Sequence, residues 1–416
     1  MFIHDEYKKC LKSKNYKDLE IAVADFLKTN EIEESIISNN EEVEELASVI
    51  EVIFKDAYCD GEEKGDLTDL ISIMIKSQIK IAEPEYSESD IDYIGLKLKM
   101  IENIPQPEQR TPEWYEFRNN RLTASDLWSI ANWNDSKVYD ILKKKCGIEQ
   151  KYNPGPALLH GIKFEEVATR IYEKRTNTEI VEFGCLPHQF IPYFGASPDG
   201  ICGINSKNRN YIGRMLEIKC PKSRIITGFI PEVYRAQIQG QLEVCDLEYC
   251  DFLECDIKVY NCKNDFIEDS FINQDGTIDY SKTKVGNEKG ALFETLDTST
   301  MKYSYEYCNN EFKSVQEIES WEEPFIDKIL DSDNLEHAGT TLWYLNHISI
   351  VLVKRDREWF QSNFYKIKKF WGQVEDARIN GVPEKKKKDK IEKIDMLQFT
   401  GSDAAKASNV VLDFNN

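Results

Sequence analysis

The sequence has no long apolar run, and its first residues do not resemble a secretory signal. The longest largely aliphatic run, from Ile348 to Val353, is far shorter than the roughly 20 residues that a membrane-spanning helix needs. The opening residues, Met1 to Glu6, lack the basic-then-apolar order of a signal peptide. We therefore expect an intracellular protein that has no membrane partner.

Several classes of site are also missing. The eleven cysteines are scattered without a Cys-x-x-Cys pair, which favours reduced thiols over a disulfide framework. The closest grouping, Cys245, Cys250 and Cys255, falls on expected helix and strand positions and argues against zinc or an iron–sulfur cluster. No GxxxxGK[ST] segment supports a kinase or ATPase. Of the five histidines, His160 and His188 stand in no nucleophile context, which disfavours a Ser-His hydrolase.

Negative charge is abundant, but it is unevenly spread. The net charge is −21, from 53 basic and 74 acidic residues. Residues 1–105 carry roughly −13 of it, whereas residues 106–255 carry only about −1. A near-neutral segment can still concentrate positive charge along one groove. The acidic total therefore does not exclude a nucleic-acid enzyme.

Composition divides the chain into parts. Residues 1–104 show the apolar spacing of short amphipathic helices and predict an acidic accessory domain, either a structural cap or a partner-binding module. Pro105 and Pro107 mark a linker. Residues 105–380 have α/β texture, and the polar stretch at about 261–340 is expected to be an insertion carrying some strand.

The remaining residues, 381–416, form a lysine-rich tail. Its run Lys385–Lys388 suits a solvated tail, a DNA-steering segment or a nuclear-import signal. Within the α/β region, periodicity predicts strands near 192–197, 214–220, 249–260 and 348–353, and helices over 156–175, 231–245 and 356–377.

The most informative pattern is Ser197-Pro198-Asp199-Gly200, followed by an apolar strand that carries Glu217 and Lys219. Alternate side chains of a strand share a face, so Glu217 and Lys219 lie together. A hairpin entered from the Pro-Asp-Gly turn would bring Asp199 beside them. Charges on such a strand are costly unless they are paired or bound to metal. We therefore expect a site for a hard divalent cation that acts on a phosphodiester.

Two helices offer further polar groups. On the helix 156–175, Glu165 lies at the edge of the buried stripe and Glu166 points away, so only Glu165 is expected to reach a cleft, unless it is an ordinary boundary residue. On the helix 231–245, Gln237 and Gln241 share a face. Buried amides need hydrogen-bond partners, which could be a metal-bound water, DNA or nearby main chain.

A phosphate site is suggested upstream. Arg118 and Arg121 precede a helix expected to start near Thr123, with Ser125 in its first turn. A helix N-terminus with free N–H groups, a hydroxyl and an arginine can hold a phosphate. The same segment could equally be a simple helix cap, since Thr123 and Asp126 have the spacing of a capping box.

In order along the chain, these motifs resemble the lambda exonuclease / YqaJ viral recombinase family of the PD-(D/E)xK nuclease superfamily. The resemblance covers roughly residues 105–260, returns near Val351–Asp356 and rests on five segments: Arg118 with Thr123-Ala124-Ser125, Gly161-x-x-x-Glu165, Ser197–Gly200, Glu217-x-Lys219-Cys220-Pro221, and Ala236-Gln237-x-Gln239. It implies a restriction-endonuclease-like α/β (α+β) core, in which helices flank a mixed central sheet and an N-terminal helical domain is added.

The resemblance also implies roles for individual residues. Asp199, Glu217 and the backbone carbonyl of Ile218 would bind one or two Mg²⁺ or Mn²⁺ ions, and Glu165 would help to hold a metal. Lys219 would position or activate the attacking water, and Gln237 would orient that water or the phosphate. The terminal 5′-phosphate would be bound by Arg118, Arg121, Thr123 and Ser125.

The implied reaction is digestion of the 5′-ended strand of linear duplex DNA to mononucleotides, for recombination or repair. Its implied partners are double-stranded DNA with a free end, a single-strand annealing protein and further copies of the chain in a ring trimer, at a cytoplasmic, viral-replication or nuclear location. Two alternatives stay open: a metal-dependent endonuclease or RecB-like repair nuclease, and a nuclease-fold DNA-binding or assembly scaffold.

Overall fold

The computed structural model describes residues 83–384 apart from 108, 110, 149–154, 227 and 309–313, together with positions 23, 26, 43, 45–52, 71 and 75. Most of the helices expected before residue 83, and the run Lys385–Lys388, therefore lie outside the described residues. Within the described part of the chain, no helix is both long enough and apolar enough to cross a bilayer.

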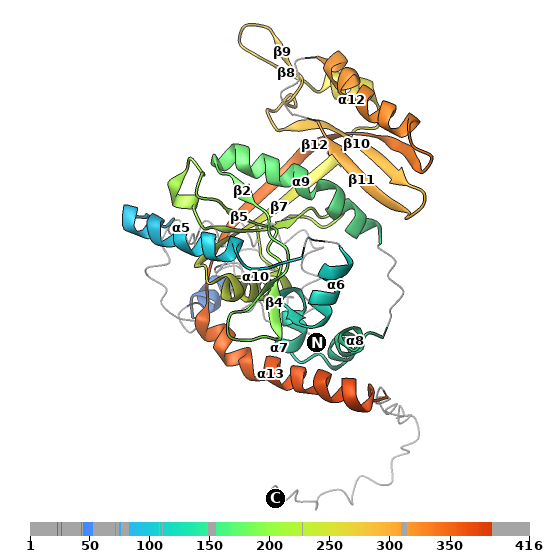
Figure 1. The fold of residues 1–416 in the computed structure, drawn as a ribbon. Coiled ribbons are helices and arrows are strands. Elements are labelled where there is room, and N and C mark those ends of the chain that lie inside the picture. The colour runs from blue at the N-terminus through green and yellow to red at the C-terminus, as the bar shows by residue number, and fades with distance from the viewer. Residues whose placement is uncertain are drawn as a thin grey trace, which may run out of the picture.

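A seven-stranded sheet forms the centre of the molecule (Figure 1). Only the β6–β7 pair is parallel among its neighbouring strands, so the sheet is mixed, as the resemblance implies. In spatial order its strands are β11 (Lys302–Tyr307), β10 (Lys289–Asp297), β12 (Leu335–Lys354), β7 (Tyr249–Val259), β6 (Met215–Lys219), β5 (Gly200–Cys202) and β2 (Ile180–Val181). Two smaller sheets contain β1 (Leu122–Thr123), β4 (Phe194–Ala196) and β3 (Leu186–Pro187), and β8 (Phe271–Ile272) and β9 (Ile278–Asp279).

Helices flank this sheet (Figure 1). They are α5 (Glu88–Glu102), α6 (Pro112–Asn119), α7 (Leu127–Ala131), α8 (Asp135–Lys145), α9 (Pro156–Thr176), α10 (Glu232–Cys245), α11 (Lys263–Glu268), α12 (Val315–Leu330) and α13 (Arg357–Asn380), with 3₁₀ turns η1 (Ala124–Asp126) and η2 (Arg209–Tyr211). The predicted fold class, helices flanking a mixed sheet, is confirmed.

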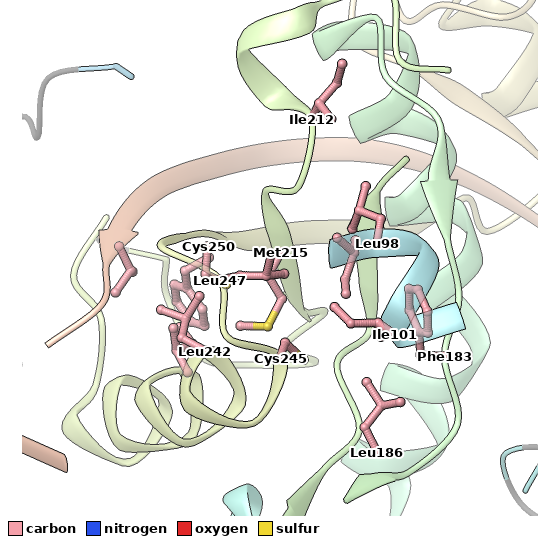
Figure 2. Close-up of a cluster of buried hydrophobic side chains, with 14 of the residues drawn as sticks. Leu98, Ile101, Phe183, Leu186, Ile212, Met215, Leu242, Cys245, Leu247 and Cys250 are labelled. Atoms are coloured by element: carbon pink, nitrogen blue, oxygen red, sulfur yellow. The ribbon is translucent and has the colours of Figure 1, made fainter. Parts of the chain in front are cut away.

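The alternation of β6 decides which helix covers which face. Leu216 and Ile218 pack into one apolar cluster with the buried stripe of α9. Met215 points the other way and packs with α10 and α5. Figure 2 shows this second cluster, with Met215 near residues of α10 and of the turn that follows it. Because Glu217 and Lys219 share the face of Met215, the strand directs both charges toward α10.

The structure adds detail to two expectations about the chain's organisation. The stretch 261–340, expected to be an insertion carrying some strand, supplies β10 and β11, which extend the main sheet beside β12 (Figure 1). The strand predicted near 348–353 begins earlier, at Leu335, and its first half pairs with β10. That half has polar, partly exposed positions, so its sequence does not show a strand pattern. Helix α5 contributes Leu98 and Ile101 to the core cluster of Figure 2, while the domain division at residue 104 stays a prediction.

Close packing also fixes α10 against the η1–α7 segment. A Cβ atom on Gly240 would lie 2.9 Å from Leu127 Cδ2 and 3.0 Å from the Cβ of Ala124. Glycine therefore allows the helix to approach the segment that carries Thr123 and Ser125. This contact places the amides of α10 beside the expected phosphate-binding residues.

Candidate active site

Both carboxylate oxygens of Glu217 accept hydrogen bonds from neighbouring side chains. Glu217 is fully buried on β6, and its Oε1 atom accepts hydrogen bonds from Lys219 Nζ and, at 2.7 Å, from Gln237 Nε2. Its Oε2 atom accepts from Gln241 Nε2, also at 2.7 Å. A buried carboxylate is tolerated only when such donors compensate for its lost hydration. The structure thus brings together the strand pair and the α10 amides that the sequence singles out.

Asp199 completes this group from the turn before β5. The hairpin expected there forms, since Gly200 pairs with Leu216, and Asp199 Oδ2 accepts from the Ile218 backbone N–H at 2.7 Å. Burial raises the pKa of Asp199 well above its usual value, and the negative charge of Glu217 adds to this shift. Burial alone would lower the pKa of Lys219, yet Glu217 and Asp199 raise it. Lys219 is therefore held as a cation between two acids.

A cavity of about 170 Å³ opens beside these groups. Arg118 crosses it from α6, with Nη1 donating to Ser197 Oγ at 3.1 Å and Nη2 to Ser125 Oγ at 3.4 Å. The indole of Trp114 supports the guanidinium at 4.3 Å. The lining residues are Gln109, Trp114, Arg118, Thr123, Ala124, Ser125, Glu165, Ser197, Asp199, Gln237 and Gln241. An arginine with two hydroxyl partners therefore lies in one cavity with the carboxylates.

One predicted phosphate ligand is placed elsewhere. Arg121 does not line this cavity, because its guanidinium lies 3.6 Å from the ring of Phe117 and donates to the Phe117 carbonyl at 3.2 Å. The helix expected from Thr123 is only the 3₁₀ turn η1 followed by the five-residue α7. Thr123 makes no capping bond to the backbone there, and its hydroxyl bonds Asp126 Oδ2 at 3.2 Å. Side chains, not a long helix dipole, thus provide the polar groups of this cavity.

A larger cavity of about 720 Å³ adjoins the same carboxylates. It shares Gln109, Glu165 and Asp199 with the smaller one. The sequence predicts that Glu166 points away from any cleft, and this is wrong, because Glu166 lines the larger cavity. Its carboxylate accepts from Arg170 Nε at 2.6 Å, one turn along α9. Glu165 alone of the two glutamates faces both spaces.

Residues 113–248 match the sequence model of the YqaJ-like viral recombinase domain. Over these residues the chain is similar to the YqaJ-like viral recombinase domain. The matched segment contains Arg118, Glu165, Asp199, Glu217 and all the other residues predicted for the site. The strands β10, β11 and β12 lie outside the matched residues.

Individual proteins are also similar to the chain. The uncharacterized protein R354 of Acanthamoeba polyphaga mimivirus is 31% identical over 313 residues, which are 70% of this chain and 56% of that protein. The chain thus spans about half the length of this relative. The crystal structure of LHK-Exo with dAMP has 18% identity and a TM-score of 0.38, covering 65% of this chain and 95% of that one. A phage-related exonuclease from Haemophilus somnus 129PT has 13% identity and a TM-score of 0.34, with coverages of 62% and 96%.

The donor atoms of the candidate site suit a hard cation. Mg²⁺ and Mn²⁺ prefer carboxylate and carbonyl oxygens, and Asp199, Glu217 and Glu165 offer carboxylates near one cavity. Burial raises the pKa of Asp199 most, and the charge of Glu217 raises it further. A bound cation would favour the ionised form of this carboxyl. Among the described residues, however, no three His, Cys, Asp or Glu side chains surround one point. The carboxylates suit the ion by type, while both oxygens of Glu217 accept hydrogen bonds from Lys219, Gln237 and Gln241.

Sequence reasoning missed part of the arrangement. It left Gln241 between a structural and a functional reading, and Gln241 bonds both Glu217 and, at 3.2 Å, the Ser197 carbonyl. Its four-residue spacing from Gln237 had placed both amides on one face of the helix, but it did not identify their common partner, Glu217. Trp114 beneath Arg118 and Tyr234, whose ring lies 5.1 Å from Lys219 Nζ, were not singled out. Single aromatic residues carry no pattern that separates such support from ordinary packing.

Proposed function

We propose that this protein is a metal-dependent DNA exonuclease that digests the 5′-ended strand of linear duplex DNA to mononucleotides. The observation that carries the proposal is the buried Glu217 with its lysine and two amides, next to a cavity that also holds Asp199 and Arg118. Such a group of carboxylates and cations suits phosphodiester hydrolysis. The YqaJ-like domain supports the same reaction class.

Each side chain of the site has a separate role in the proposed reaction. The Lys219 ammonium would hold and polarise the attacking water and offset charge that develops on the phosphate. Gln237 would orient that water or a phosphate oxygen through its amide. Arg118, with Thr123 and Ser125, would hold the terminal 5′-phosphate in the smaller cavity. When bound by Asp199, Glu217, Glu165 and the Ile218 carbonyl, Mg²⁺ or Mn²⁺ would supply a Lewis acid and a more acidic water.

The proposed setting is intracellular, at a viral replication site or in the nucleus. The digested duplex would expose a 3′-ended strand for an annealing protein in recombination or repair. Assembly into a ring trimer would place an acidic exterior around a less acidic lining. Sedimentation with and without DNA tests this assembly, and a monomer under both conditions would remove the ring.

The deciding experiment follows linear duplex DNA labelled at the 5′ or at the 3′ end, with Mg²⁺, with Mn²⁺ and with a chelator. We expect labelled mononucleotide at once from the 5′ label, shortened strands from the 3′ label, and no product with chelator. Glu217→Gln should lower the rate by about 1,000-fold.

Covalently closed duplex of the same sequence is the control, and it should stay intact. Cleavage of the closed circle would identify an endonuclease instead. DNA binding with no cleavage under any metal would identify a scaffold.

A further inference from the structure

Strand β11 presents a row of tyrosines to the larger cavity. Tyr303, Tyr305 and Tyr307 alternate along the strand, so their side chains share one face of the sheet. All three line the 720 Å³ cavity together with Glu165, Glu166 and Thr169 of α9. Residues that the sequence places in an insertion thus form a wall next to the catalytic carboxylates.

The wall is fixed at one end and open at the other. Tyr307 donates its hydroxyl to the Lys163 carbonyl at 3.1 Å, and Arg170 lies 5.4 Å from its ring. Lys163 also bonds Glu294 of β10, which ties the hairpin to α9. At the open end, Tyr303 is 47% exposed. The strand is therefore positioned by the core, while its outer ring faces solvent at the cavity.

We infer that the Tyr303–Tyr307 face of β11 is a stacking wall for the bases of single-stranded DNA that enters or leaves the active site; this inference rests on the proposed nuclease function. The opposite side of the cavity carries the acids Glu165, Glu166 and Asp199. Acids repel phosphates, whereas aromatic rings bind the faces of any base. The chemistry of the wall therefore selects bases over phosphates.

The dimensions favour one strand over two. A cavity of about 720 Å³ is in the volume range of small-ligand sites. A DNA duplex is too wide for such a space, since its major groove alone is about 12 Å across. The ring centroids of Tyr305 and Tyr307 lie 6.4 Å apart. Bases stacked in a strand are about 3.4 Å apart, so successive rings of the wall suit bases that have been pulled apart. Such unstacking is available in a single strand.

The test measures binding of a short fluorescein-labelled single strand, and of the matching blunt duplex, to the full chain in chelator, where no cleavage occurs. Tyr303→Leu keeps apolar bulk but removes the ring, and Tyr303→Phe keeps the ring. We expect Tyr303→Leu to bind the single strand about ten-fold more weakly or worse, and Tyr303→Phe to bind it like the parent. Duplex affinity should change less.

Tyr365→Leu is the matched control, because Tyr365 is 62% exposed on α13 and lines neither cavity. Thermal midpoints of all variants confirm folding. Single-strand affinity that is unchanged in Tyr303→Leu, or lost equally in Tyr303→Phe, would overturn the inference. The binding measurement does not depend on cleavage. A protein that binds single strands through Tyr303 but cuts no DNA would therefore contradict the proposed function and still support the stacking wall.

Discussion

The two adjacent glutamates of α9 differ in what surrounds them. Glu165 faces both cavities, while Glu166 faces only the larger one and is paired with Arg170. Glu165 can therefore serve the cation site and Glu166 serves mainly the helix surface, where i,i+4 pairs contribute little. The two glutamates can therefore be compared directly, because they have the same charge, lie on the same helix and differ only in the direction of their side chains.

We predict that Glu165→Gln lowers the rate of duplex digestion by about 10- to 100-fold, because it removes one charge from the cation site. Glu166→Gln should leave the rate within about two-fold, because its pair is half-exposed and on the surface. Initial rates in Mg²⁺ on end-labelled duplex measure both. Equal loss in the two variants would contradict the assignment of Glu165.

The two arginines of the α6 region allow a second comparison. Arg118 lies in the smaller cavity with Ser125, whereas Arg121 is turned onto Phe117 outside it. We predict that Arg118→Gln reduces the preference for 5′-phosphorylated over 5′-hydroxyl ends by roughly ten-fold, because it removes a charge-assisted hydrogen bond. Competition between the two substrates measures the ratio. Arg121→Gln should leave this ratio unchanged, even if it alters stability.

At the scale of elements, the sheet is held together behind the active site by a buried polar group. Asp251 on β7 accepts from the Tyr172 hydroxyl of α9 at 2.6 Å and from Arg214 Nη1 at 3.4 Å. Both Asp251 and Arg214 are nearly fully buried, and Arg214 also bonds the exposed Glu83. This group links α9 to β7 and to the start of β6, the strand that carries Glu217.

We predict that Arg214→Met lowers the free energy of unfolding by about 3–5 kcal/mol, because it leaves the Asp251 carboxylate buried without its cation. The double variant Arg214→Met/Asp251→Asn should be less destabilised than Arg214→Met alone. Urea denaturation followed by circular dichroism measures both. Glu83→Gln is the control with an expected loss below about 1 kcal/mol, since its carboxylate is exposed.

At the scale of the whole molecule, the charge of −21 opposes DNA, while the site must still receive a phosphate. Glu165 and Asp199, which line both cavities, place further acidic groups there. Positive charge in and around the candidate site comes from a few side chains, among them Lys219 and Arg118. Binding of a duplex end should therefore depend on divalent ions as well as on salt.

We predict that a 5′-phosphorylated duplex end binds the Lys219→Met variant at least about ten-fold more tightly in Ca²⁺ than in chelator. Fluorescence anisotropy at constant ionic strength measures this. The ratio should shrink in the double variant Lys219→Met/Glu217→Gln, which has lost a site carboxylate. Equal affinity with and without the divalent ion would argue against a cation site.

The sequence alone determined the local parts of this protein. The turn before Gly200 and the alternation of Glu217 and Lys219 depend on neighbouring residues, so they could be predicted, as could helices α9, α10 and α13, whose buried stripes have helical period. The charges of β6 were recognisable because an apolar strand does not carry them without compensation.

Only the tertiary structure decided which distant groups share a space. Whether Arg118 or Arg121 enters the cavity depends on how α6 packs, and Gln241 could not be told from a structural amide until α10 lay over β6. Tyrosines alternate with polar residues in β11, but this edge strand is only six residues long and lies within a polar stretch, so the sequence placed it in an insertion. Long-range strand pairing, which carries no local sequence signal, placed their tyrosines beside Glu165.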